Sequence, residues 1–282
     1  MRQLKASDLA PFLAPPLPPP VPSPIQFHPA PQNASFPLPW PLAAPVPLSA
    51  ELALLPHLLR SQREVGSFCF LPPGRLSPVL SACAKLSVPL FTALSLRRHV
   101  MKQRLPYLSE AALNLGSSTQ KKHSADAFED AVASFLASEG VSFLTEKQQA
   151  RVNAAGLPPP QPGVKHPGTP DFLFPSPLLL APPGSPPLAL SWLEIKHFYG
   201  ASSIDPDGRS AVGKIPQKAA AYKANFGNGA FLFAYGCGAE FKRRLPQGVL
   251  VLDSSHLDMT ETHRRMALYC RNTGVDGPSI LP

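Results

Sequence analysis

Residues 169–200 read TPDFLFPSPLLLAPPGSPPLALSWLEIKHFYG. Two apolar runs, DFLFPSPLLL and LALSWLEIKHFYG, flank the sequence APPGSPP, which is rich in turn-forming residues. Apolar runs bounded by such turn signals are typical of β-strands. The pattern therefore predicts a wide β-hairpin that folds about Gly184.

Two charged residues lie in the second apolar run of this hairpin. Successive side chains of a strand point to opposite faces, so Glu194 and Lys196 should share one face. Leu193 and Ile195 should point to the other face. Asp171 opens the first strand, and the fold of the hairpin should place it across the ladder from Glu194 and Lys196. Two carboxylates and one ammonium group are therefore expected to meet at one end of the sheet.

The clearest amphipathic helix is predicted over residues 123–138, HSADAFEDAVASFLAS. Its apolar side chains fall on one stripe at helical spacing: Phe128, Val132, Phe135 and Leu136. At about 100° per residue, Glu129 lies beside Leu136 at the edge of this stripe. A carboxylate there can reach a site where the helix meets the sheet, although glutamates at such edges are also common in helices with no site.

Further elements are predicted on both sides of the hairpin. They are a short strand at 141–146, a helix at about 214–226, strands at 230–236 and 247–255, and a final helix at roughly 257–270. Pro216 near the start of the second helix and Gly227 after its end support its bounds. The order helix, strand, hairpin, helix, strand predicts an α/β domain of about 150 residues.

The first part of the chain differs from this domain in composition. Proline is far above its usual share of about 5%, so residues 1–60 should lack regular structure. From about 76 to 113 the pattern turns helical, and a basic cluster that begins at Arg97 is more typical of a solvated helix face than of a phosphate contact. We therefore divide the chain into a Pro-rich disordered tail at 1–70, a helical region at 71–122, the α/β domain at 123–270 and a C-terminal tail at 271–282.

The charge balance favours a polyanionic partner. Charged residues make up 16% of the chain, yet the net charge is +8 and the pI is near 9.5. Nucleic acid is the commonest partner of such a chain, although many basic proteins have no specific polyanionic partner. Composition alone leaves both interpretations open.

Cysteines and apolar runs bear on the compartment. The four cysteines, at positions 69, 83, 237 and 270, form no C-x-x-C pair, and none has a histidine at zinc-ligand spacing. Buried reduced thiols are then the default, which fits the cytoplasm or the nucleus. No apolar run reaches the ~20 residues of a membrane span without proline or charge, so we expect no membrane partner.

The predicted cluster at the end of the hairpin has the composition of a site for metal-assisted phosphodiester hydrolysis. Carboxylate oxygens of Asp171 and Glu194, the backbone carbonyl of Ile195 and waters suit octahedral Mg²⁺, and Mn²⁺ takes similar ligands. Lys196 could position a water or stabilise the developing negative charge. A D…ExK pattern occurs by chance in many proteins, but here the charges lie in the apolar run SWLEIKHF, and buried charges need partners or a metal.

Several short motifs between residues 124 and 253 also occur together in a known family. They are TPDF at 169–172, WLEIK at 192–196, Tyr222 with NFG at 225–227, Gly229, YG at 235–236, and SFL at 142–144. In these motifs the region resembles the codanin-interacting nuclease family, whose domain is named for its T-P-D motif. Residues 79–101 resemble, more loosely, the helical region that precedes that domain.

The resemblance implies a fold, a function and site residues. Members of the family are regarded as divergent PD-(D/E)xK nucleases that have a restriction-endonuclease-like core and a Mg²⁺ site and act in or around the nucleus. The implied site residues are Asp171 and Glu194 as metal ligands, Lys196 as a catalytic group and Glu129 as the acid from the helix. Where relatives carry a glutamine, this chain has Lys218, with Gln217 one position earlier. Either the register differs by one residue or the role has passed to a lysine.

Three functions of different classes follow, and the third is an adaptor that works through the Pro-rich tail. The leading one is a metal-dependent nuclease that cleaves DNA or RNA. The second is a catalytically weak nuclease-fold module that binds a codanin-like protein and serves as a scaffold, and the intact acidic residues and lysine favour the enzyme over it. His166 and His197 flank the site and are weaker candidates, because histidines without a second ligand are usually structural. The run FKRR at 241–244 fits a phosphate-contact patch, a short nuclear-localisation element or a solvated loop.

Overall fold

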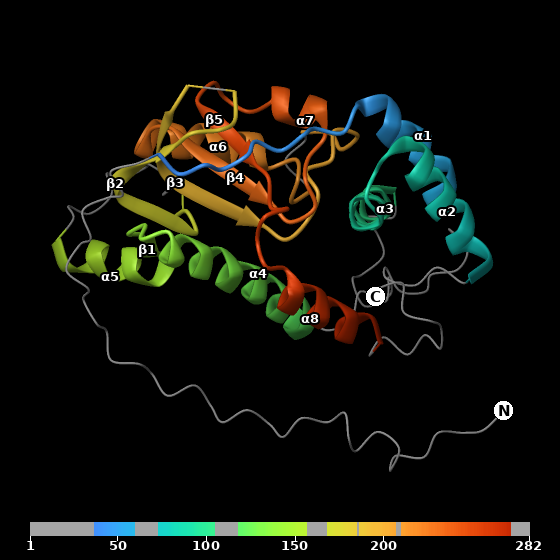
Figure 1. The fold of residues 1–282 in the computed structure, drawn as a ribbon, viewed down its shortest axis with the longest axis horizontal. Helices are drawn as coiled ribbons and strands as arrows, with labels where there is room; N and C mark the ends of the chain where they lie inside the picture. Colours follow the sequence, from blue (N-terminus) through green and yellow to red (C-terminus); the bar gives the residue numbers. More distant parts are fainter. Residues whose placement is uncertain are drawn as a thin grey trace, which may run out of the picture. The chain divides into compact units, whose positions relative to one another are not determined.

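The hairpin lies in the middle of a five-stranded mixed sheet, which the computed structural model shows with its flanking helices (Figure 1). Six stretches of the chain are described: residues 37–59, 73–104, 118–156, 168–184, 186–206 and 210–271. The strands follow the order β1-β2-β3-β4-β5 across the sheet. The predicted α/β class is confirmed in this form, as a mixed sheet flanked by helices.

The strands of the hairpin are β2 (Phe172–Leu180) and β3 (Leu188–Lys196), and they pair antiparallel. Gly184 has a φ of 72° in the turn between them, a conformation that a residue with a side chain rarely adopts. The register shifts between Leu173 and Leu178, where β2 carries two exposed prolines. Proline cannot donate a ladder hydrogen bond, which accounts for the irregularity.

Three short strands complete the sheet. β1 (Leu144–Thr145) pairs antiparallel with β2, whereas β4 (Gly229–Phe233) and β5 (Val249–Leu252) continue from β3 in parallel. β4 is buried along its whole length, as its apolar sequence predicts. Because β2 runs antiparallel to β3, the first residues of β2 lie beside the last residues of β3, at the same end of the two strands.

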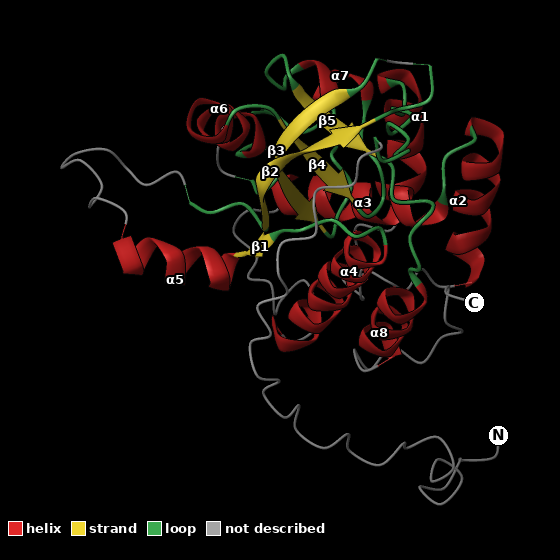
Figure 2. Ribbon diagram, turned by 60° about the vertical axis from the view of Figure 1, so that its left-hand side comes forward, coloured by secondary structure: helices red, strands yellow, loops and turns green. Residues whose placement is uncertain are grey.

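Helices cover both faces of the sheet (Figures 1 and 2). α4 (Ser118–Ser138) lies on one face with α8 (Thr260–Arg271) beside it, and α6 (Ile215–Phe226) lies on the other. The predicted stripe of α4 is part of a core made by Phe128, Val132 and Leu136 with Phe172, Leu193 and Ile195 of the sheet. Trp192 and Tyr222 belong to a second core on the opposite face. Successive side chains of β3 thus point to opposite faces of the sheet, as the sequence predicts.

The expectation that residues 1–60 lack regular structure is wrong for α1 (Leu48–Leu59). Leu54 and Leu58 of this helix are completely buried. They recur at the four-residue spacing of a helical stripe, and the apolar area they bury outweighs the high proline content of the surrounding sequence. Residues 1–36 and 60–70 of the predicted tail lie outside the described residues.

Residues 37–47, ahead of α1, cross the domain as an extended segment. Leu38 forms a parallel bridge with Leu180 of β2, and Leu42 forms an antiparallel bridge with Leu252 of β5. Trp40 between them is completely buried, and its indole N–H donates to the carbonyl of Asp253 at 2.9 Å. This segment is therefore part of the folded domain rather than a tail.

The predicted helical region contains α2 (Pro73–Leu86) and α3 (Leu90–Arg104). Arg97 of α3, expected on a solvated face, is instead 4% exposed, and its Nε donates to the carbonyl of Leu58 at 3.1 Å. The last carbonyls of a helix have no partner within the helix, so this guanidinium satisfies the end of α1. The remainder of the predicted span, 105–113, lies outside the described residues.

Besides α1, two further helices are not predicted by the sequence pattern. α5 (Glu146–Gly156) replaces the end of the expected strand at 141–146, of which only β1 forms. α7 (Ala239–Arg243) contains most of the run FKRR, which is therefore not a loop. Within that run Arg244 donates to the carbonyls of Ser202 and Ile204, at 3.0 and 2.7 Å, so its guanidinium stabilises the neighbouring chain.

The structure describes two cysteine side chains and several apolar helices. Cys83 and Cys237 are free and buried, as expected of reduced thiols, whereas the side chains of the other two cysteines are not described. No single helix in the described stretches is long and apolar enough to cross a membrane. One pair of helical segments is long and apolar enough only when the two are taken together: Pro78–Leu86 and Leu90–Val100. The chain bends by 112° between them.

Candidate active site

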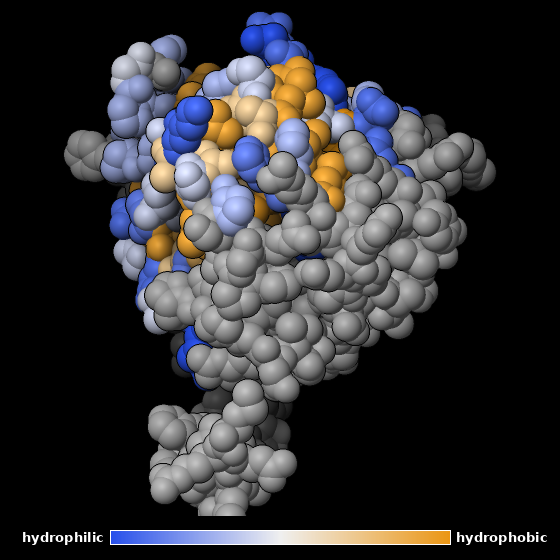
Figure 3. All heavy atoms as spheres, turned by 90° about the vertical axis from the view of Figure 1, so that its right-hand side faces the viewer, coloured by the Kyte–Doolittle hydropathy of each residue, from blue (hydrophilic) through white to orange (hydrophobic). Residues whose placement is uncertain are grey.

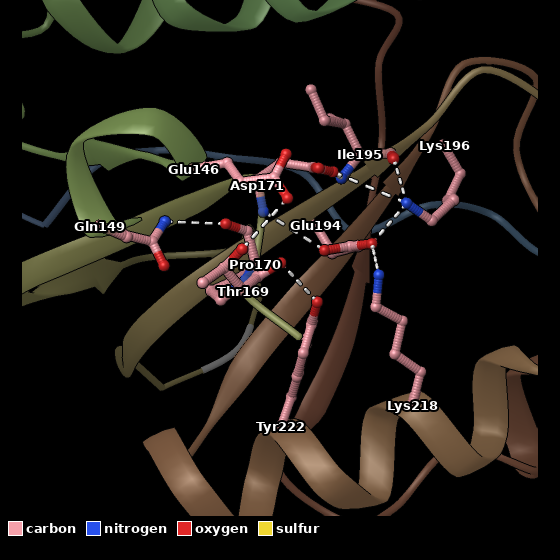
Figure 4. Close-up of polar contacts among 10 residues, drawn as sticks. All are labelled: Glu146, Gln149, Thr169, Pro170, Asp171, Glu194, Ile195, Lys196, Lys218 and Tyr222. Atoms are coloured by element: carbon pink, nitrogen blue, oxygen red, sulfur yellow. Dashed lines mark hydrogen bonds and ion pairs between the residues drawn. The ribbon is translucent and has the colours of Figure 1, made fainter. Parts of the chain in front are cut away.

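The hairpin brings Asp171, Glu194 and Lys196 together at the edge where β2 begins and β3 ends (Figure 4). Phe172 pairs with Leu193 and shares its face, so Asp171, one residue earlier, lies on the face of Glu194. The amide of Asp171 donates to Glu194 Oε2 at 3.3 Å. The predicted convergence therefore follows directly from strand parity and register.

Lys196 contacts three oxygen atoms of the cluster. Its Nζ lies 2.5 Å from Glu194 Oε1, 2.7 Å from the carbonyl oxygen of Ile195 and 3.6 Å from Asp171 Oδ2. Three oxygen atoms, two from carboxylates and one from the backbone, thus face one point. These are the oxygen donors that the sequence nominates as metal ligands.

Lys218 on α6 supplies a second ammonium group. Its Nζ lies 2.5 Å from Glu194 Oε1 and 5.1 Å from the centre of the Tyr222 ring. Gln217 is exposed. The helix register therefore directs Lys218, and not the neighbouring glutamine, toward the acidic cluster. Glu194 itself is completely buried, so the two lysines provide the charge compensation that a buried carboxylate needs.

The Asp171 carboxylate is held by the strand that carries Glu194. Its Oδ2 accepts a hydrogen bond from the amide of Ile195 at 2.7 Å. Burial raises the pKa of Asp171 to about 6; the charge of Glu194 acts in the same direction, and Lys196 opposes both. This carboxyl group is therefore poised to change charge near the neutral range.

Glu129 lies on α4 and is partly buried. Burial is the main cause that raises the pKa of Glu129, and the charge of Asp171 is the next. The negative charge of Asp171 thus disfavours the ionisation of Glu129. No hydrogen bond or ion pair joins Glu129 to the cluster among the residues that the structure describes.

Two residues of α5 belong to the site although sequence reasoning missed them. Glu146 Oε1 accepts a hydrogen bond from Thr169 Oγ1 at 3.2 Å. Gln149 Nε2 donates to the carbonyl of Pro170 at 2.8 Å (Figure 4). One sequence feature could have indicated them: they are three residues apart, which places them on one side of a helix. The helix itself was not predicted, because the sequence of α5 lacks a strong apolar stripe.

The histidine candidates do not join the cluster. His197 follows Lys196 and lies on the face of α4, where its ring is 6.0 Å from Phe128 and its Nε2 is 3.0 Å from the hydroxyl of Tyr235. Burial lowers the pKa of His197 to about 4, so the ring is neutral near pH 7. His166 lies outside the described residues.

The donor set fits Mg²⁺ as a site of two carboxylates and one carbonyl. Mg²⁺ is usually bound by one or two carboxylates and keeps several waters, so Asp171, Glu194 and the Ile195 carbonyl suffice. The described part of the chain holds no group of three or more His, Cys, Asp or Glu side chains placed to hold a metal ion. Glu129 on α4 stays a predicted acid of this site.

Comparison with family models, with curated proteins and with solved structures gave no match to this chain. The resemblance to the codanin-interacting nucleases therefore rests on the short motifs alone. Of their residues, Asp171, Glu194, Lys196 and Tyr222 lie together around the end of the hairpin.

Proposed function

We propose that the chain is a metal-dependent nuclease that hydrolyses phosphodiester bonds of DNA or RNA, with a PD-(D/E)xK core. The observation that carries this proposal is the convergence of Asp171 Oδ2, Glu194 Oε1 and the Ile195 carbonyl around Lys196 Nζ. Hard oxygen donors beside an ammonium group are what phosphoryl chemistry requires. The five-stranded mixed sheet flanked by helices is compatible with such a core.

Each member of the cluster has a distinct role in this proposal. Asp171 and Glu194, with the Ile195 carbonyl, would hold Mg²⁺ or Mn²⁺. The ion would supply positive charge that polarises the phosphate and lowers the pKa of a water molecule. Lys196 would stabilise the negative charge that develops on the phosphate oxygens.

Lys218 would assist Lys196 from α6. Both ammonium groups contact Glu194 Oε1, so binding of an ion at this carboxylate requires at least one of them to move. A lysine released in this way is free to contact a substrate phosphate. The net charge of +8 supports a polyanionic substrate.

The direct test is hydrolysis by the purified full chain. Labelled single-stranded, duplex and branched DNA and RNA are incubated with Mg²⁺, with Mn²⁺ or with EDTA. We expect cleavage of at least one substrate with metal and none with EDTA, and loss of cleavage in Asp171→Ala and Glu194→Gln. Glu240→Ala is the matched control, because this acid pairs with Arg243 on α7 and has no contact with the site. Inactivity of the wild type on every substrate with both metals would refute the proposal.

A second candidate function is a scaffold that binds a codanin-like protein, and exposed apolar side chains favour it. Leu52 on α1 and Leu80 on α2 are 50% and 42% exposed, and apolar surface is visible on this side of the domain (Figure 3). Capture of a purified codanin-like protein by the wild type, with loss of binding in Leu52→Glu and Leu80→Glu, is the expected result. If the wild type fails to bind that protein, or if both variants bind as well as the wild type, the scaffold function at this surface is wrong.

A further inference from the structure

Two buried side chains hold the backbone of the turn that precedes Asp171. Tyr222 Oη, on α6, donates to the carbonyl of Thr169 at 2.7 Å. Gln149 Nε2, on α5, donates to the carbonyl of Pro170 at 2.8 Å. Proline has no N–H, so the turn has one backbone donor fewer with which to fix itself. Helices on two sides of the sheet edge therefore hold these carbonyls through their side chains (Figure 4).

Packing fixes the orientation of both donors. The Tyr222 ring is fully buried and meets the Trp192 indole edge-on at 5.2 Å. The indole in turn lies against Gly229, where an added Cβ would come within 2.0 Å of it. Gln149 is 3% exposed, and its amide group also donates to the carbonyl of Leu144 at 3.0 Å. Neither contact is an incidental surface hydrogen bond.

The contact of Gln149 bears directly on Asp171. The carbonyl of Pro170 and the amide N–H of Asp171 belong to one planar peptide unit. Gln149 holds the carbonyl end of this plane, and Glu194 Oε2 accepts from the N–H end at 3.3 Å. The plane from which the Asp171 side chain departs is thus fixed at both ends.

We propose that Gln149 and Tyr222 are positioning residues that set where the Asp171 carboxylate lies relative to Glu194, and thereby set the affinity of the site for a divalent cation. The inference rests on the proposed function, because the cation site is part of that function. Partners that orient a ligand in this way typically change metal affinity or activity by about 10- to 100-fold when they are removed.

Tyr222 acts as a neutral donor in this arrangement. Burial raises the pKa of its phenol, and the charges of Glu194 and Asp171 raise it further. The hydroxyl thus keeps its proton over the working pH range and can donate to Thr169 throughout. It is a hydrogen-bond donor and not a base.

The test uses two conservative variants of the full chain. Tyr222→Phe deletes only the hydroxyl and keeps the ring packing, and Gln149→Met keeps the length of the side chain but removes its donors. Two quantities are measured: Mn²⁺ affinity by calorimetry, and exchange of the Asp171 and Ile195 amides by NMR without metal. We expect each variant to bind Mn²⁺ about 10-fold or more weakly and to exchange both amides faster. At saturating Mn²⁺, turnover should recover toward the wild-type value.

Matched controls separate positioning from general stability. Tyr199→Phe deletes a buried hydroxyl that donates to Glu51 at 2.8 Å, away from the site. Gln148→Met removes an amide of α5 whose hydrogen bonds, within the described residues, are to Thr145. Both should lower thermal stability at most and leave Mn²⁺ affinity unchanged.

Three outcomes would overturn the inference or the function on which it rests. Unchanged Mn²⁺ affinity and unchanged amide exchange in Tyr222→Phe and Gln149→Met overturn the inference. So does an equal loss of affinity in Tyr199→Phe, because the effect is then one of stability. A wild type that binds no Mn²⁺ overturns the proposed function, and amide exchange then decides by itself whether the two side chains hold Asp171.

Discussion

At Asp171, burial opposes the proposed role of the residue as a metal ligand. Its carboxylate must be charged to hold a cation, yet burial and the neighbouring Glu194 raise its pKa to about 6. A raised carboxyl pKa means that ionising this group is harder in the folded than in the unfolded protein. The stability that protonated Asp171 contributes is therefore fully present below the unfolded pKa of about 3.9, and it is lost as pH rises through about 6. Without a cation, ionised Asp171 therefore destabilises the domain at neutral pH.

Asp171→Asn should stabilise the metal-free protein above pH 6. Asparagine keeps an oxygen that can accept from Ile195 but has no charge to bury, so the gain should reach about 1–3 kcal/mol at pH 7.5 and disappear below pH 4. Chemical denaturation in EDTA across this pH range measures it. A gain that is the same at pH 4 and pH 7.5 would contradict the assigned pKa direction.

Glu261→Gln is the control, because its effect on stability should have the opposite sign to that of Asp171→Asn. Hydrogen bonding to Arg264 lowers the pKa of Glu261 to about 2. The stability that ionised Glu261 contributes is therefore present above the ordinary glutamate pKa, and it is lost as pH falls toward 2. The variant should lose stability at neutral pH, and the loss should shrink toward pH 2.

Lys196 should affect rate more than binding. Its ammonium group is assigned to the developing charge, so Lys196→Ala should lower kcat by about 10²- to 10³-fold while Mn²⁺ and nucleic-acid binding persist. Lys196→Arg should rescue poorly, because a bulky planar guanidinium cannot take the place of a compact ammonium group beside the phosphate. Single-turnover kinetics with a separate binding assay distinguish the two effects, and full activity of Lys196→Ala would remove Lys196 from the mechanism.

At the scale of elements, the extended segment before α1 should be essential for stability. Trp40 is completely buried, so Trp40→Ala should cost about 3–5 kcal/mol of unfolding free energy. Leu52→Ala, on the exposed side of α1, should change it by no more than about 0.5 kcal/mol. Equilibrium denaturation measures both, and equal small effects would mean that the segment contributes little to the core.

Elements with strong periodic patterns were predictable from the sequence, and those stabilised by tertiary contacts were not. The hairpin was predictable because two apolar runs enclose a turn at Gly184, and α6 because Pro216 and Gly227 mark its ends. α1 was missed because its helical stripe lies in proline-rich sequence. Its Leu54 and Leu58 are buried only when α2 and α3 pack against it.

The residues of the site likewise fall into those that local sequence patterns predict and those that depend on tertiary contacts. Strand parity and register are local, so Glu194, Lys196 and Asp171 could be placed together from the sequence. Gln149 contributes through a hydrogen bond to a carbonyl 21 residues later in the chain, and no local pattern encodes such a contact. Lys218 required the helix register, which the sequence left open between two neighbouring positions.

For the whole molecule, the excess of positive charge predicts how binding depends on salt. With a net charge of +8, nucleic-acid binding should weaken steadily as salt concentration rises, because each phosphate contact releases counterions. Asp171→Ala should keep this salt dependence, since it removes an acidic group and no phosphate contact. Fluorescence anisotropy from about 50 to 200 mM salt tests this, and binding that is independent of salt would argue against a nucleic-acid substrate.

The choice of cation gives the most discriminating test of the molecule as an enzyme. Mg²⁺ and Mn²⁺ require near-octahedral coordination by oxygen, which two carboxylates, one carbonyl and waters satisfy, whereas Ca²⁺ accepts more ligands at longer and more flexible distances. Ca²⁺ should therefore support nucleic-acid binding but little turnover, because the attacking water is poorly aligned. Asp171→Ala should lose most of its affinity for all three ions, since it removes a hard oxygen ligand outright. Turnover with Ca²⁺ equal to that with Mg²⁺ would contradict the octahedral coordination, and wild-type Mn²⁺ affinity in Asp171→Ala would show that the cation is not held by this cluster.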